Sequence, residues 1–207
     1  MKYQSTLIWL IRGIFFVFSV FEMIRLNWAD VALLIAGFVL SFIPYLYEKW
    51  VGIKIPLGAC LILDIFLLGT QFFGSYLGAY TYFSWWDIML HLSSGILVGY
   101  IGLILLITLD RNHLLFIKKK IGVIILFVFA IAVTGAVFWE IFEFTSDTLF
   151  GTNTQLGSLR DTMGDLICGT IVGGVFALYI GMMLHEEKKS CVSKLLQLNS
   201  SKAKRKK

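Results

Sequence analysis

Short polar segments interrupt an otherwise apolar chain and contain its residues best suited to chemistry. In WWDIMLHLSSG, residues 85–95, Asp87 and His91 lie four residues apart. In FWEIFEFTSD, residues 138–147, Glu140 and Glu143 lie three residues apart. Residues at these spacings share one face of an α-helix. Each segment is therefore expected to present a pair of polar side chains in one direction.

A third segment, RDTMGD at residues 160–165, repeats this pattern. Asp161 and Asp165 lie four residues apart, directly after Arg160. An arginine suits binding of a phosphate or carboxylate group. We therefore expect Arg160 to contact substrate.

The three segments contain far more acidic than basic side chains, with His91 and Arg160 as the local counter-charges. Carboxylates gathered in a low dielectric either hold protons or recruit a cation. Oxygen ligands suit divalent cations, and a histidine extends the choice to manganese, zinc or iron. The predicted ligands of a divalent metal cation are Asp87, His91, Glu140, Glu143, Asp161 and Asp165. The predicted catalytic residues are Asp87, His91, Glu140 and Asp165. The alternative is that these residues are ordinary polar residues of helix ends, solvated by headgroup water and linked by hydrogen bonds.

The elements that must position these residues are membrane-spanning helices. Of the 207 residues, 58% are hydrophobic and 15% are charged, against about 45–50% and 25% in soluble proteins. A soluble fold of this size could not hide so much apolar surface. Runs long enough to cross a bilayer lie at 6–26, 29–48, 55–74, 87–109, 121–145 and 161–184. We therefore expect an all-α polytopic membrane protein, a bundle of six transmembrane helices.

The basic residues predict how these spans are oriented. Of the 18 lysines and arginines, all but Arg12, Arg25 and Arg160 fall at the N-terminus, in the loops after spans two and four, or in the tail. Basic loops stay in the cytoplasm, so both termini are expected there. The protein is then a multi-pass cell-membrane protein, and the polar segments lie at the extracytoplasmic ends of spans four to six.

The chain is expected to form one six-span membrane domain, residues 1–184, and a basic cytoplasmic tail, residues 185–207. The tail ends in KAKRKK, which predicts attraction to anionic lipid. Membrane lipid is thus the expected partner. Nucleic acid is not, because no folded reading element accompanies the basic tail. The patterns GILVG (95–99) and GTIVG (169–173) favour close helix packing, within one chain or between chains, so they leave the oligomeric state open.

One further charge lies deep in the expected bilayer. Asp64, in LILDIFLL, falls near the middle of the third span, where an ionised aspartate costs roughly 2.5–3.5 kcal/mol or more. It could hold a proton, pair with Arg12, or lie at the floor of a polar pocket. We favour a buried structural pair.

The polar segments resemble those of a known family. WWDIMLHLSSG, FWEIFEFTSD and TNTQLGSLRDTMGDLICGTIVGG are similar to segments of the YjdF-like family of uncharacterised bacterial membrane-spanning proteins. The resemblance covers about residues 80–175, and it implies a helical membrane fold with a site drawn from these spans. More distantly, the order of the motifs resembles VanZ-like proteins, although Cys168 stands before Gly169 where an asparagine is usual. The residues that match the YjdF-like pattern are Asp87, His91, Glu140, Glu143, Gln155, Asp161, Thr162 and Asp165. The resemblance implies that Gln155 belongs to the site, and we expect it to contact substrate together with Arg160.

Three functions remain open at this point, and the residues do not decide whether the protein is an enzyme. The first is hydrolysis at the headgroup of a lipid or cell-envelope precursor, with a divalent cation or a carboxylate activating water. The second is an ion- or proton-coupled transporter in which Asp64 is an intermediate step. The third is a non-catalytic envelope or interaction protein whose polar cluster receives a partner.

Overall fold

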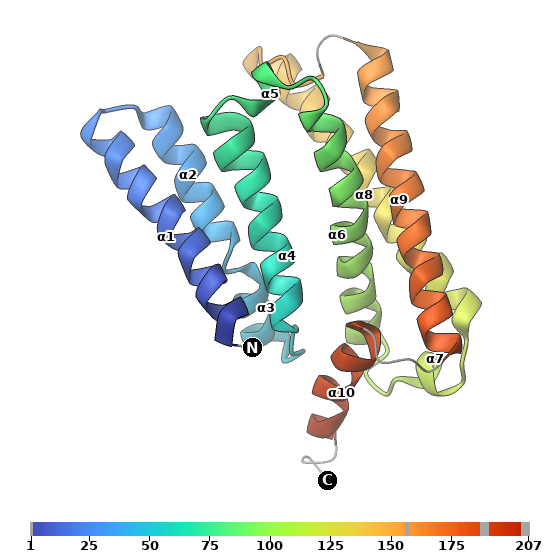
Figure 1. The fold of residues 1–207 in the computed structure, drawn as a ribbon. Coiled ribbons are helices and arrows are strands. Elements are labelled where there is room, and N and C mark those ends of the chain that lie inside the picture. The colour runs from blue at the N-terminus through green and yellow to red at the C-terminus, as the bar shows by residue number, and fades with distance from the viewer. Residues whose placement is uncertain (1, 156–157, 187–190, 204–207) are drawn as a thin grey trace. The chain divides into compact units, whose positions relative to one another are not determined.

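A computed structural model describes residues 2–155, 158–186 and 191–203, and over these residues the chain is all helical (Figure 1). In lipid, a helix satisfies every backbone polar group within its own segment, which explains the absence of strands from the described residues. Six segments are long and apolar enough to cross a membrane: Gln4–Ile24, Trp28–Val51, Leu57–Tyr76, Trp86–Leu109, Ile121–Phe150 and Leu159–His185. The predicted six-span architecture is confirmed, and the orientation of the termini stays a prediction.

The helices form two compact units. The first comprises residues 1–87 and 194–207, and the second comprises residues 88–193. The boundary falls within the first turn of helix α6 (Trp86–Leu109). Each unit is described by itself.

The first unit packs helices from three spans around an apolar core. It contains α1 (Lys2–Ile24), α2 (Trp28–Leu40), α3 (Ile43–Val51), α4 (Leu57–Leu67), the π-helix η1 (Leu68–Tyr76), α5 (Ala79–Tyr82) and most of α10 (Cys191–Ala203). On α10, the Asn199 side chain accepts a hydrogen bond from the Lys54 amide at 2.7 Å and donates one to the Lys54 carbonyl at 3.0 Å. The buried core residues are Ile11, Phe15, Leu34, Leu67 and Phe72.

Two of the three spans in this unit are irregular. The second span divides into α2 and α3 near Ser41, and Pro44 occupies the second position of α3. A proline there lacks only an amide that would be unsatisfied at a helix start in any case. The third span changes from α-helix to π-helix after Leu67. Such π-helical stretches are rare and occur frequently at functional sites.

The second unit contains α6, the short α7 (Leu114–Ile117), α8 (Ile121–Phe150) and α9 (Leu159–His185). Helices α6 and α9 touch through glycines. A Cβ atom on Gly95 would lie 2.7 Å from the carbonyl oxygen of Gly169 and 2.9 Å from the amide nitrogen of Gly173. The backbones therefore meet directly, as GILVG and GTIVG predict. The buried residues of the unit include Leu103, Ile107, Ile124, Val128, Ala132, Ala177 and Ile180.

Candidate functional site

The polar residues of α6, α8 and α9 lie at comparable heights along their helices. At a rise of about 1.5 Å per residue, His91 lies about 27 Å from the Leu109 end of α6. By the same rise, Glu140 lies about 28 Å from the start of α8 and Asp165 about 30 Å from the end of α9. The hydrocarbon core of a bilayer is about 30 Å thick. The three residues are therefore expected near the same headgroup boundary.

His91 is buried between two carboxylates on different helices. Its Nδ1 atom lies 4.0 Å from Oε1 of Glu140, and its Nε2 atom lies 3.9 Å from Oδ2 of Asp165. All three side chains are less than a tenth exposed. The sequence prediction that these residues converge is thus met by the geometry.

A group suited to a metal ion lies on one side of the histidine. Asp87, His91 and Asp165 each offer a ligand atom, and these atoms lie within 4.8 Å of one another. Asp87 is half-buried in the first turn of α6, one turn before His91. Its position relative to His91 follows from the continuous helix. The group combines carboxylate oxygens with an imidazole nitrogen, as expected from the sequence.

Packing of glycines sets the level of this group. Gly95 lies one turn after His91 on α6, and Gly169 lies one turn after Asp165 on α9. Both helices run in the same direction from the polar end, so the glycine contact holds the two ligands at one height. The same contact leaves a Cβ on Gly169 only 3.9 Å from the His91 carbonyl oxygen.

The second glutamate of α8 has a different setting. Glu143 is buried, and its Oε1 accepts a hydrogen bond from the indole nitrogen of Trp139 at 3.0 Å. Trp139 was not singled out from the sequence, because an aromatic residue near the end of a span is typical of the membrane interface. The observed hydrogen bond gives it a positioning role for Glu143.

The loop after α8 is held by one carboxylate. Asp147 accepts hydrogen bonds from the Thr152 hydroxyl at 2.6 Å, from the Thr154 amide at 2.8 Å and from the Gln155 amide at 3.0 Å. Gly151 ends α8 in the left-handed conformation, with φ of 66°. These contacts turn the chain so that Gln155 points back between the helices.

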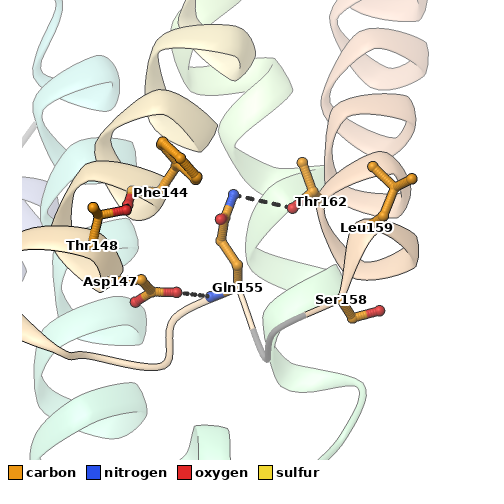
Figure 2. A pocket seen from close by; sticks show the side chains of 7 residues that line it. All are labelled: Phe144, Asp147, Thr148, Gln155, Ser158, Leu159 and Thr162. Atoms are coloured by element: carbon orange, nitrogen blue, oxygen red, sulfur yellow. Dashed lines mark hydrogen bonds between the residues drawn. The ribbon is translucent and has the colours of Figure 1, made fainter.

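Gln155 links α8 to α9. Its amide nitrogen donates to the Thr162 hydroxyl at 3.1 Å (Figure 2). The same nitrogen lies 3.5 Å from Oε2 of Glu140. Helix α9 begins with Ser158 as its N-cap, which accepts from the Asp161 amide at 3.4 Å. The carboxylate of Asp161, in that first turn, acts electrostatically on His91.

Two adjoining pockets lie along α8 and α9. The first, of about 460 Å³, is lined by Phe144, Asp147, Thr148, Gln155, Ser158, Leu159 and Thr162 (Figure 2). The second, of about 300 Å³, is lined by Val137, Glu140, Ile141, Phe144, Gln155, Thr162 and Leu166. They share three residues, and the second reaches Glu140. Many of the lining residues are exposed and apolar, so the groove is open to the lipid side.

Arg160 differs from the buried residues of the cluster in its exposure. It is exposed in the first turn of α9, beside Leu159 of the first pocket. It lines neither of the two pockets, so its contact with substrate stays a prediction. The apolar lining residues Phe144 and Leu166 gave no functional signal in the sequence, because they are indistinguishable there from residues that face lipid.

A comparison with protein families identifies related chains. The model of the family described as predicted membrane protein (DUF2238) matches residues 6–187, which include most or all of each span. This finding agrees with the YjdF-like resemblance, whereas it lends no support to the more distant similarity to VanZ-like proteins. A Thermotoga maritima protein described as uncharacterized is 33% identical over 128 residues, which are 61% of this chain and 64% of that protein. No solved structure matches the chain.

Proposed function

The chain belongs to the DUF2238 family of predicted membrane proteins, and we propose that the polar ends of α6, α8 and α9 form a metal-dependent hydrolase site for the headgroup of a lipid or lipid-linked cell-envelope precursor. The arrangement of His91 carries this proposal. Its Nε2 faces Asp165, whereas its Nδ1 faces Glu140. Metal-binding histidines characteristically use one nitrogen for the ion and donate the other N–H to a carboxylate.

The three ligands fit a divalent first-row metal ion. Asp87 and Asp165 supply oxygen and His91 supplies nitrogen, a set suited to zinc, manganese or iron(II). A divalent ion would balance the charge of the two carboxylates. Three protein ligands leave coordination positions for water and substrate, which distinguishes a catalytic site from a closed structural one.

The remaining predicted ligands have supporting roles in this proposal. Glu140 would orient the His91 ring electrostatically, since its Oε1 lies 4.0 Å from Nδ1, beyond hydrogen-bonding distance. Glu143, held by Trp139, and Asp161, which acts on His91 electrostatically, keep the surroundings of the ion negative. Such outer carboxylates typically change metal affinity by 10–100-fold when removed.

The proposed reaction is hydrolysis of the headgroup. A divalent ion held by Asp87, His91 and Asp165 would supply Lewis-acid activation of water and of the bond to be cleaved. The water oxygen adds to the phosphorus or acyl carbon of the headgroup, the bond to the leaving group breaks, and the leaving group takes a proton. Arg160 is suited to hold the anionic headgroup, and Gln155 lines the pocket.

The pockets along α8 and α9 support a substrate that arrives from the membrane. Their mixed polar and apolar lining suits an amphiphile whose chain stays in lipid while its headgroup enters. The expected level of the site, about 27–30 Å along each helix by the helical rise, supports a substrate whose headgroup lies at the boundary of the bilayer core. We infer from the basic loops that this level is the extracytoplasmic one.

Metal analysis of the purified protein tests the proposal. We expect a stoichiometric transition metal to copurify in mild detergent and to be lost from His91→Ala and Asp165→Asn at unchanged folded yield. His113→Ala, in a loop, and Asp30→Asn, at the start of α2, are the matched controls and should retain it. Unchanged metal content in both site variants would refute a site at these residues.

A second assay separates binding from hydrolysis. The metal-loaded protein should release headgroup from lipid extracts in detergent or vesicles, and His91→Ala should not. A loaded protein that cleaves none of them would retain the metal site but contradict the hydrolase. A proton-coupled transporter is the second candidate, because Arg12 and Asp64 are buried charges in the first unit.

A further inference from the structure

The first unit contains a buried ion pair that the metal site does not use. Asp64 lies on α4 with no exposed surface, and its Oδ2 lies 3.9 Å from Nε of Arg12 on α1. The pairing considered from the sequence is therefore present. The separation is nevertheless longer than a hydrogen bond between such atoms, which is about 2.7–3.2 Å.

The donors of the arginine point elsewhere. Nε of Arg12 donates to the Ser41 hydroxyl at 3.1 Å, and Nη2 donates to the Ser41 carbonyl at 2.7 Å. Its guanidinium also lies 4.1 Å from the ring centre of Phe42 and 5.1 Å from that of Trp9. Arg12 is thus held by its own helix and by the Ser41 turn, and neither oxygen of Asp64 accepts a hydrogen bond from the described protein.

Other buried acceptors in the unit share this condition. Oε1 of Gln71 and Oε2 of Glu22 also accept no hydrogen bond from described residues. Glu22 is fully buried at the end of α1, and its other oxygen accepts from the Tyr76 hydroxyl at 2.7 Å. Ser19 is buried one turn before Glu22. Oε1 of Gln71 and Oε2 of Glu22 therefore require donors, because burying a polar atom without a partner is costly.

A proton satisfies Asp64 better than a metal cation does. The guanidinium of Arg12, 3.9 Å away, would repel a metal ion. A proton removes the buried charge and supplies a donor, at the cost of a weaker attraction to Arg12. That cost is small, because the Ser41 oxygens and the Phe42 ring already hold the guanidinium.

Few other charges face this carboxyl. Helices α1 and η1 pack against α4; α1 contributes Arg12, and η1 carries the titratable Tyr76, which is bonded to Glu22. Cys60 lies one turn before Asp64 on α4 itself. Glu48 of α3, near Cys60, accepts a hydrogen bond from the Ile55 amide at 2.6 Å.

We propose that Asp64 is a proton-binding site in the centre of the first unit. A proton that reaches it from the Glu22 end would pass Gln71 on η1 and Ser19 on α1, which are other polar side chains inside the unit. Gln71 packs against α2, because a Cβ on Gly37 would meet its Oε1. Gln71 therefore lies inside the three-span unit, on the π-helix that follows the helix of Asp64.

Carbodiimide labelling tests the proposal on the unmodified protein. Dicyclohexylcarbodiimide is apolar and adds to a protonated carboxylic acid to give an N-acylurea. We expect peptide mass spectrometry to find this adduct on Asp64, in a fraction that falls as the pH rises. Asp30, at the exposed start of α2, is the internal control and should stay unlabelled.

The counter-charge sharpens the test. Arg12→Gln removes the positive charge that favours ionised Asp64, so half-labelling should move to higher pH. Infrared spectroscopy reports the same proton without reagent access: the protonated-carboxyl band should be lost in Asp64→Asn and shifted in Asp64→Glu. Absence of the adduct at every pH at which the protein is folded, together with no band that Asp64→Asn or Asp64→Glu alters, would establish a permanently ionised pair and overturn the proposal.

Discussion

The contact between α6 and α9 allows the site to be perturbed without touching a ligand. Gly95→Ala adds one Cβ that would lie 2.7 Å from the Gly169 carbonyl oxygen and 2.9 Å from the Gly173 amide nitrogen. Both are backbone atoms that cannot rotate away. An ordinary contact begins at about 3.4 Å, so the helices must separate by several tenths of an ångström.

This separation has a cost and a consequence. Overpacking of this kind costs about 1–3 kcal/mol, partly offset by about 1 kcal/mol from replacing glycine by alanine within a helix. His91 and Asp165 lie one turn from the contact, and their facing atoms are 3.9 Å apart. Metal–ligand distances tolerate about 0.2 Å, so we expect metal affinity to fall by about 10–100-fold.

Gly164→Ala is the matched control. Gly164 lies on α9 next to Asp165, and a Cβ there would meet nothing within 4 Å. The control should bind metal normally and gain up to about 1 kcal/mol of stability. Chelator competition measures the affinity, and unfolding in denaturing detergent measures the stability. Wild-type affinity in Gly95→Ala would show that the spacing of α6 and α9 does not set the site.

Three further predictions use other features of the chain. Metal binding should weaken as the pH falls and should release protons in calorimetry, because carboxylates and imidazole bind metal only when deprotonated; a pH-independent affinity would argue against His91 as a ligand. With the native cysteines replaced by serine, a membrane-impermeant thiol reagent should label Asn153→Cys in intact cells, but Arg111→Cys only after permeabilisation; the reverse pattern would invert the predicted topology. Gly151→Ala should cost about 1 kcal/mol, since φ of 66° disfavours a side chain; unchanged stability would show that the end of α8 relaxes.

The spans were predictable because the bilayer leaves the backbone little choice. A run of 161–184 was expected where the helix is Leu159–His185, and 87–109 where it is Trp86–Leu109. The fifth span ends later than expected, at Phe150. The expectation stopped where the apolar run ends at 145, whereas Asp147 remains helical and uses its carboxylate to hold the following loop.

The details of the site were less accessible from the sequence. Helical spacing shows that Glu140 and Glu143 share a face and that Trp139 lies one turn before Glu143, but not that Glu140 lies beside His91 of another helix. In a soluble protein the apolar stripe would fix the rotation of each helix. Here the lipid-facing side is as apolar as the core, so packing of small residues sets the rotation instead. The glycine patterns carried that information for α6 and α9.

The two proposed sites follow from one imbalance between acceptors and donors. At the polar ends of α6 and α9, Asp87 and Asp165 lie near a single imidazole, and a divalent ion could satisfy both carboxylates at once. In the first unit, Arg12 lies beside Asp64, but its guanidinium donates its hydrogen bonds to Ser41. The charge of Asp64 is balanced there, but its oxygens accept no hydrogen bond from the described residues. A bound proton would supply a donor at this carboxyl, whereas a metal cation would be repelled by Arg12. Added metal should therefore not protect Asp64 from carbodiimide labelling. Arg12→Gln, in contrast, should move half-labelling of Asp64 to higher pH.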